Sequence, residues 1–231
     1  MSDLTVVFYT ANVLHEPFAG IVRAQLQKAI GDYPLLSVSQ KPMDFGENIC
    51  IGEIGRSHLN LYRQILIGSK AAKTKYVAMA EDDVLYSFEH FHCCRPKPNH
   101  FGYNMNKWGI FTWSKPPVFS YRHRKIVNSL IAERDMLVEA MEERFTKYPD
   151  DDKVPLKHWG DPGRYEGYLG VSVRATEELY SKVPNIVFSH EEAFGFLSRG
   201  TRKALGNPQA VEIPVWGRAE EIVKLFFKKE D

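Results

Sequence analysis

Long apolar runs are absent from this sequence: none in its 231 residues approaches the roughly 18 residues that a membrane-spanning helix requires. The segment from Met1 to Leu4 carries no basic stretch ahead of an apolar one, so we expect no signal peptide. Cysteine is also scarce, because the chain has only three and two of them are adjacent. That number does not make a disulfide framework. Together these shortages predict a cytoplasmic protein that does not insert into a membrane.

A strong excess of one charge is absent too. The chain has 30 Lys and Arg against 29 Asp and Glu, which excludes a grossly polyanion-binding protein but not a local charged patch. Its hydrophobic content of 44% and charged content of 26% are those of ordinary globular proteins, and its length suffices for a substantial core. No internal repeat, low-complexity tract or shift in composition divides the sequence, so we predict a single domain over residues 1–231.

A structural zinc site is disfavoured, although histidines and cysteines gather between residues 90 and 100. The chain has no Cys-X₂-Cys pair, which is the usual spacing of zinc ligands. The neighbouring Cys93 and Cys94 cannot easily present both sulfur atoms to one tetrahedral ion. The sequence therefore does not favour zinc at His90, His92 or His100.

Alternating strand and helix patterns indicate an α/β protein with a mixed, mainly parallel sheet flanked by helices. Strand-forming residues at Leu4–Tyr9 precede apolar residues at helical spacing from Phe18 to Ile30, and a second strand-like run follows at Pro34–Ser39. This order is the opening of a parallel sheet. The further elements predicted are a loop over residues 40–56, a helix through Leu59, Tyr62 and Leu66, a strand from Tyr76, strands at Trp108–Trp113, Val118–Tyr121 and Ile126–Ile131, a helix from Asp135 to Lys147, a strand at Pro184–His190 and a helix over 218–229.

The main chemical signal lies at Tyr76–Tyr86, where an apolar, strand-like run leads directly into Glu81, Asp82 and Asp83. In open α/β sheets the ligand crevice lies outside the carboxyl ends of the strands. Three adjacent carboxylates in such a crevice repel one another unless a cation offsets their charge. Their hard oxygen atoms suit Mg²⁺ or Mn²⁺. An acidic turn that closes an ordinary strand is the alternative interpretation.

This strand with Glu81-Asp82-Asp83 resembles the Asp-X-Asp signature of nucleotide-sugar glycosyltransferases of the GT-A fold, in its Glu-Asp-Asp variant. The resemblance implies that Asp83 binds the metal that bridges the donor diphosphate, and that Glu81 and Asp82 contact the ribose and the donor sugar. Members of this family frequently supply a late histidine as the remaining protein ligand to the metal. His190, at the end of the last predicted strand, fits that place, and a hydrogen-bonded surface histidine is the alternative.

The resemblance also implicates residues earlier in the donor half. Thr10 and Asn12 lie in the polar turn after the first strand, which would face the nucleotide. Arg56, Ser57 and Asn60 open the helix that leads to the carboxylate strand, where the family has a basic residue and an asparagine. They are therefore candidates for phosphate or base contacts. Structurally, Ser57 can equally be the N-cap of that helix, and the other two can be solvated residues of its first turn.

The glycine- and proline-rich loop over residues 158–168 carries the candidates for the general base. In inverting GT-A enzymes, a carboxylate downstream of the metal motif deprotonates the acceptor hydroxyl. Glu166 and Asp161 match that place in the chain, and Glu166 comes first because an aspartate before Pro162 is often a turn residue. Trp159 in the same loop is a candidate acceptor contact.

Residues 90–132 contain no aspartate or glutamate. A surface that neutralises phosphates and stacks exposed bases combines cations with aromatic side chains, so this segment could bind a nucleic acid as acceptor, with Trp113, Arg122 and Arg124 as contacts. Alternatively, the aromatic residues form core and the cations a solvated face. The segment carries seven cations, Arg95, Lys97, Lys107, Lys115, Arg122, Arg124 and Lys125, and the aromatic series Phe91, Phe101, Tyr103, Trp108, Phe111, Trp113, Phe119 and Tyr121.

We therefore expect a metal-dependent glycosyltransferase that moves a sugar from a nucleoside diphosphate donor, of the UDP-sugar kind, to a hydroxyl, with inversion favoured. The donor half covers about residues 1–89, the acceptor half about 90–217, and a closing helix 218–229. The acceptor is a hydroxymethylated base in DNA, a small sugar or a protein. A nucleotidyltransferase would usually carry a glycine-rich, basic loop after the first strand, which Thr10–Leu14 is not. A non-catalytic nucleic-acid-binding protein would leave the three carboxylates without a purpose.

Overall fold

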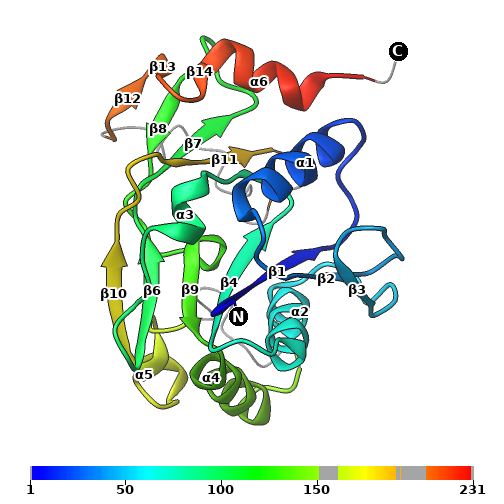
Figure 1. Cartoon of the computed structure of the whole chain (residues 1–231), viewed down its shortest axis with the longest axis vertical. Helices are drawn as coiled ribbons and strands as arrows, with labels where there is room; N and C mark the ends of the chain where they lie inside the picture. The colour runs from blue at the N-terminus through cyan, green and yellow to red at the C-terminus, as the bar shows by residue number, and fades with distance from the viewer. Residues whose placement is uncertain (1, 151–160, 191–192, 194–206, 230–231) are drawn as a thin grey trace.

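The computed structural model describes residues 2–150, 161–190, 193 and 207–229. Its largest sheet has seven strands in the order β10-β6-β9-β4-β1-β2-β3 (Figure 1). Strands β3, β2, β1 and β4 are parallel, β9 is antiparallel to β4 and β6, and β10 is parallel to β6. The strands are β1 (Leu4–Thr10), β2 (Leu35–Ser39), β3 (Glu47–Cys50), β4 (Tyr76–Glu81), β6 (His100–Asn104), β9 (Leu130–Glu133) and β10 (Ala175–Leu179).

Helices cover both faces of this sheet, because the buried side chains of its strands alternate between two cores. Val7 and Tyr9 of β1 pack in a cluster with apolar residues of α2 and α4, whereas Val6 and Phe8 pack with residues of α1 and α3. The predicted α/β class, with a mixed, mainly parallel sheet flanked by helices, is thus confirmed (Figure 1). The helices are α1 (Phe18–Ile30), α2 (His58–Ala71), α3 (Phe88–His92), α4 (Arg134–Lys147), α5 (Glu166–Leu169) and α6 (Ala219–Phe227).

A second sheet, in the order β12-β8-β7-β11-β5, follows the first at the carboxyl end of β4. Glu81 is the last residue of β4 and Val84 is the first of β5, so Asp82 and Asp83 connect the two sheets. Helix α6 packs on the second sheet through a cluster that includes Ile222 and Phe188. The remaining strands are β5 (Val84–Leu85), β7 (Lys107–Phe111), β8 (Phe119–Tyr121), β11 (Asn185–Ser189) and β12 (Gln209–Ala210), with a separate pair formed by β13 (Glu212–Ile213) and β14 (Gly217–Arg218).

Several elements were not predicted from the sequence. Among them are the interior strand β6, whose Phe101 and Tyr103 are fully buried, and the short helix α3. The expected loop over residues 40–56 contains β3, and β10 was not predicted at all. These are the two edge strands of the large sheet, which need only one bonded neighbour and carry exposed polar side chains. The strand expected at residues 126–131 divides into a 3₁₀ turn and β9, and the loop over 158–168 contains the short helix α5.

The scarcity of cysteine and of long apolar runs concerns two features of the structure, the disulfide bonds and the length of apolar helices. Within residues 2–150, 161–190, 193 and 207–229, no helix is long and apolar enough to cross a membrane. The sulfur atoms of Cys93 and Cys94 are bonded to each other, whereas Cys50 is free and exposed. The bond between adjacent residues ties no two elements together, so it is not a framework that supports the fold.

Gly68 allows α2 to approach the sheet closely. A Cβ atom at this position would lie 2.4 Å from Val7 Cγ1 and 3.1 Å from Val38 Cγ2, both on buried strands. Gly68→Ala should therefore lower the free energy of unfolding by roughly 1–3 kcal/mol, as overpacking of a core does. Urea unfolding measures this. Gly167→Ala, whose Cβ meets nothing within 4 Å, is the control and should change stability by less than about 0.5 kcal/mol; equal effects of the two substitutions would contradict the close packing.

Candidate functional site

Three carboxylates stand at the end of β4, and hydrogen bonds fix the first two. Glu81 accepts one hydrogen bond at Oε1 from the Tyr9 hydroxyl (2.8 Å) and one at Oε2 from the Asn128 amide (2.9 Å). Asp82 Oδ2 accepts a hydrogen bond from the Thr10 hydroxyl. Tyr9 and Thr10 end β1, which runs parallel beside β4, so their side chains reach the carboxylates from the neighbouring strand.

Burial makes these carboxylates costly to ionise. Burial, together with the charge of the neighbouring Asp83, raises the pKa of Glu81 to about 8 and the pKa of Asp82 to about 6. The hydrogen bonds from Tyr9 and Thr10 oppose these shifts, because they stabilise the charged forms. A cation beside the three carboxylates would offset the same repulsion.

Asp83 faces His190, the histidine that the sequence singled out. The Asp83 Oδ2 and His190 Nε2 atoms lie 3.5 Å apart. Strand β11 brings the histidine there, because it pairs antiparallel with β5 and its Phe188 N–H donates to the Asp83 carbonyl oxygen (2.9 Å). Asp83 Oδ1 is buried and has no hydrogen-bond partner among the described residues. A buried, unpartnered carboxylate oxygen is a group that a cation would satisfy.

Asp83 and His190 suit a metal ion that is also coordinated by a bound ligand. The described part of the chain contains no group of three or more His, Cys, Asp and Glu side chains that could hold a metal ion. Asp83 and His190 are the two candidate ligands that the structure brings together. Mg²⁺ is commonly held by one or two carboxylates while substrate phosphates and water complete its shell. These residues therefore suit a cation held jointly with a phosphate-bearing ligand.

A cavity of about 360 Å³ lies against the carboxylates, within the size range of roughly 300–1,000 Å³ that small-molecule sites occupy. Residues from both halves of the chain meet around it, as the sequence predicted for one shared site. The predicted site residues that line the cavity are Thr10, Arg56, Ser57, Asn60, Glu81, Asp82, Asp83, Trp113, Arg122, Arg124, Asp161 and His190.

Several lining residues also hold the cavity wall in place. The Ser57 hydroxyl caps α2 by accepting from the Asn60 N–H (3.0 Å), and the Asn60 side-chain amide donates to the Ile54 carbonyl oxygen (2.5 Å). Asn12 does not line the cavity; its side-chain oxygen accepts from the backbone N–H groups of Gln40 (2.8 Å) and Lys41 (2.9 Å). The structural alternatives for Ser57 and Asn60 thus coexist with their place at the cavity.

Sequence reasoning missed several polar residues that line the cavity, namely Tyr9, Gln40, His58, Tyr62, Gln64, Asn128, Tyr165 and Ser189. Asn128 comes from the 3₁₀ turn (Val127–Ser129) that the sequence pattern presented as a strand. Gln64 donates to the Thr10 and Val38 carbonyl oxygens at the ends of two strands. No local motif marks these amides, and only the position of Tyr9 at the end of the first strand could have indicated it.

Asp161 lines the cavity, but both of its oxygen atoms are engaged. Oδ1 accepts from the Val127 N–H (2.6 Å), and Oδ2 accepts from the Arg164 guanidinium (2.9 Å). Asp161 therefore anchors the 3₁₀ turn that carries Asn128. Trp159, the predicted acceptor contact two residues earlier, lies outside the described residues.

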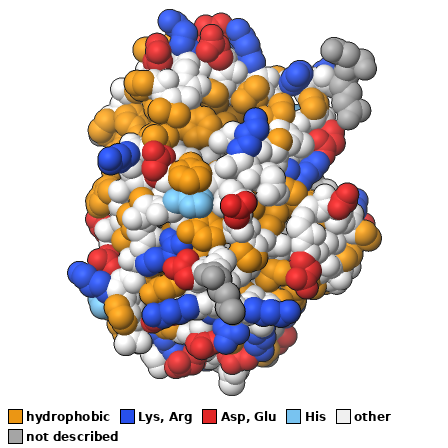
Figure 2. All heavy atoms as spheres, in the orientation of Figure 1, with side chains coloured by type: hydrophobic (Ala, Val, Ile, Leu, Met, Phe, Trp, Pro, Cys, Tyr) orange, Lys and Arg blue, Asp and Glu red, His pale blue; other side chains and the backbone are white. Residues whose placement is uncertain are grey.

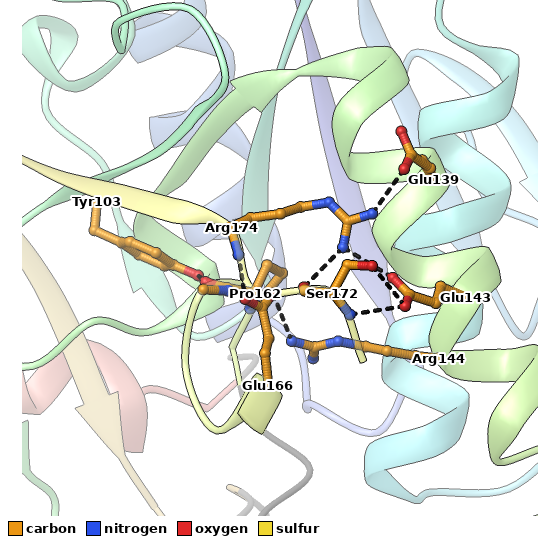
Figure 3. A network of polar contacts seen from close by, with 9 residues as sticks. Tyr103, Glu139, Glu143, Arg144, Pro162, Glu166, Ser172 and Arg174 are labelled. Atoms are coloured by element: carbon orange, nitrogen blue, oxygen red, sulfur yellow. Dashed lines mark hydrogen bonds and ion pairs between the residues drawn. The ribbon is translucent and has the colours of Figure 1, made fainter. Parts of the chain in front are cut away.

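Glu166 does not line the cavity and is 2% exposed, so the structure does not bring this predicted base to the carboxylates. Its Oε1 accepts from the Gly163 N–H (2.9 Å) and faces the fully buried Arg144 guanidinium at 3.4 Å. Its Oε2 accepts from the Arg174 N–H (2.7 Å), within a polar network that joins α4, α5 and β10 (Figure 3). The side chain holds this loop together.

The cations of residues 90–132 do not form one continuous surface. Asp3 pairs with Arg95 (3.0 Å), and Glu177 pairs with Lys97 (3.3 Å), so carboxylates from outside the segment neutralise part of its charge. On the face drawn in Figure 2, basic and acidic side chains are interspersed. The aromatic residues divide similarly: Trp113 is exposed beside the cavity, whereas four others are fully buried, namely Phe91, Phe101, Tyr103 and Phe119.

No protein-family model and no curated protein sequence matches this chain. Among solved structures, it is similar to a nucleotidyl transferase from Methanothermobacter thermautotroptrophicus, with 13% sequence identity, coverage of 79% of this chain and 88% of that chain, and a TM-score of 0.46. It is also similar to a glycosyltransferase involved in the glycosylation of the major capsid of PBCV-1 (13%, 68% and 72%, 0.40). A third similar structure is S. aureus TarS (11%, 81% and 37%, 0.44). Likenesses this distant assign no activity to the chain.

The burial of Glu166 opposite Arg144 predicts a structural effect of its removal. Glu166→Gln should lower the free energy of unfolding by roughly 3–5 kcal/mol, because it removes the carboxylate charge that faces the fully buried guanidinium. Urea unfolding measures the change, and Glu142→Gln, in the exposed pair with Lys70, should cost no more than about 1 kcal/mol. Unchanged stability together with lost turnover would instead return Glu166 to the role of general base.

Lys107, one of the cations of residues 90–132, is fully buried in β7, and burial lowers its pKa to about 7 against the opposing charge of Asp161. Between pH 7 and the ordinary lysine pKa of 10.5, the unfolded chain therefore binds more protons at this site than the folded protein. Stability of the wild type relative to Lys107→Met should rise with pH across this window, by roughly 1 kcal/mol per pH unit. Urea unfolding at pH 7, 8 and 9 measures it, with the exposed Lys115→Met as control. A difference that does not change with pH would contradict the lowered pKa.

Proposed function

We propose that this protein is a glycosyltransferase that moves a sugar from a nucleoside diphosphate donor, of the UDP-sugar kind, to a hydroxyl acceptor with the help of Mn²⁺ or Mg²⁺. The observation that carries the proposal is the Asp83–His190 pair beyond the end of β4, in which one buried Asp83 oxygen has no hydrogen-bond partner among the described residues. The cavity beside it has the size of a small-molecule site.

In this proposal Asp83 and His190 would hold the cation, which supplies Lewis-acid stabilisation of the leaving diphosphate when bound. Glu81 and Asp82, oriented by Tyr9 and Thr10, would receive hydrogen bonds from hydroxyl groups of the donor. A partly enclosed cavity excludes water, which would otherwise compete with the acceptor hydroxyl for the sugar. These roles use only the residues at the end of β1 and β4 and at the end of β11.

The proposed reaction also needs a group that receives the acceptor proton. Of the two candidate bases, Asp161 lines the cavity and Glu166 does not, so the inverting form of the proposal rests on Asp161. The two hydrogen bonds that it accepts, from Val127 and Arg164, would orient the carboxylate. During catalysis, the acceptor hydroxyl would replace Val127 or Arg164 as a hydrogen-bond donor to the Asp161 carboxylate.

Removal of the Asp83 carboxylate tests the metal and donor proposal together. Asp83→Ala should abolish Mn²⁺-dependent binding of UDP-sugars in calorimetry, because it removes one of two candidate protein ligands. Without metal the variant should melt no lower than the wild type, since the substitution relieves repulsion among the carboxylates. Asp44→Ala, at an exposed aspartate, is the matched control. Mn²⁺-dependent donor binding that survives in Asp83→Ala would sink the assignment.

A nucleic-acid acceptor, for instance a hydroxymethylated base in DNA, is proposed on a narrower surface than the whole segment 90–132. Trp113 and Arg124 are exposed and line the cavity, and Lys115 is exposed close by in the sequence. Aromatic stacking and a few phosphate contacts are what an extruded base would need.

Filter binding to DNA over a salt series tests this acceptor class. Each neutralised phosphate contributes about −0.9 to the slope of log K against log salt, so Arg124→Ala should make the slope shallower by about one such contact. Replacement of Lys28, an exposed lysine on α1, by Ala should not change the slope. A protein that shows no DNA binding at low salt acts on another hydroxyl, of a small sugar or a protein.

A further inference from the structure

Three neighbouring residues fix the position of the Arg122 side chain at the cavity. It follows β8, and its guanidinium lies over the Phe111 ring, 5.3 Å from the ring centroid, and donates a hydrogen bond to the Ser189 hydroxyl. Gly109 on β7 leaves the room for it, because a Cβ atom there would lie 2.1 Å from Arg122 Nε. Any other residue at position 109 would displace the guanidinium.

The partners of Arg122 fix its position but do not neutralise its charge. A serine hydroxyl and an aromatic ring are uncharged. No described carboxylate lies within 4 Å of the Arg122 guanidinium, which is the distance limit of an ion pair. By contrast, Arg95, Arg164 and Arg174 each pair with a carboxylate. A half-buried guanidinium with a fixed orientation and no ion-pair partner among the described residues is suited to bind an anion that enters the cavity.

The end of β11 connects Arg122 with the Asp83–His190 pair. Ser189, which receives the Arg122 hydrogen bond, is the last residue of β11 and directly precedes His190. The cavity therefore carries carboxylates and an imidazole on one part of its wall and a guanidinium on an adjacent part. A ligand that satisfies both must be anionic and able to share a cation.

We propose that Arg122, positioned by Gly109, Phe111 and Ser189, binds a phosphate oxygen of a diphosphate-bearing ligand beside the Asp83–His190 pair. This rests on the proposed function for the identity of the donor, and it replaces the acceptor role that the sequence suggested for Arg122. A guanidinium offers two parallel N–H donors that match two phosphate oxygen atoms, which neither a sugar hydroxyl nor a base requires.

The test is calorimetry with two probes: inorganic pyrophosphate in the presence of a chelator, and UDP with Mn²⁺. Arg122→Met should weaken the binding of pyrophosphate and of UDP by about tenfold or more, the usual effect of losing a charge-assisted hydrogen bond. Gly109→Ala should weaken both to a similar extent although it keeps the positive charge, because the guanidinium must move. Lys28→Met removes an exposed cation of α1 that does not line the cavity and is the matched control, with unchanged affinity.

The outcomes separate this subsite from the transferase proposal. If both variants bind the two probes as tightly as the wild type, Arg122 is only a structural link between β8 and β11 and the inference is wrong. It is equally wrong if the wild type binds neither probe. Pyrophosphate binding that depends on Arg122 and Gly109 supports the anion subsite. If UDP-sugars then bind equally well with and without Mn²⁺, the subsite is retained and the metal-assisted transferase is rejected. Melting temperatures identify a variant that fails to fold, and the other variant then decides.

Discussion

Repulsion among three adjacent carboxylates at a buried strand end is the constraint on which the rest of this structure depends. The chain could not place Glu81, Asp82 and Asp83 between two sheets without groups that stabilise their charge. The end of β1 supplies two hydroxyl donors and the 3₁₀ turn after β8 supplies an amide. The end of β11 supplies an imidazole. Three separate parts of the chain thus converge on three consecutive residues.

The same cavity carries charge of both signs on different parts of its wall. The carboxylates leave one Asp83 oxygen without a partner among the described residues, and Arg122 is held by uncharged groups. A nucleoside diphosphate with a bound cation is a ligand that addresses both conditions, because its phosphates can share the cation and also accept hydrogen bonds from a guanidinium. In the proposed function, specificity for a charged ligand would follow from the Asp83 oxygen and the Arg122 guanidinium.

The sequence predicted those parts of the molecule that are governed by local pattern. Apolar alternation and helical spacing identified β1, β4, α1, α2 and α4, and the run of carboxylates drew attention to the end of β4, where a cavity lies. It could not predict β3 and β10, because edge strands need no apolar face, nor the role of Asn128, because a single amide in a turn has no signature. Glu166 shows what residue type and position in the chain do not reveal. Its residue type and its place in the chain suited a base, and only tertiary packing reveals the buried Arg144 opposite it.

Strand β11 has a further consequence for the order in which the molecule is completed. It lies between β7 and β5, and it delivers Ser189 and His190 to a site whose carboxylates belong to a much earlier segment. Synthesis proceeds from the N-terminus, so β1 and β4 can pair long before residues 185–190 leave the ribosome. During that interval the carboxylates rely on Tyr9 and Thr10, each only 72 residues away in the chain. The proposed site is therefore completed only after residues 185–190 have been made, later than the strands β1 and β4 that carry or support its carboxylates.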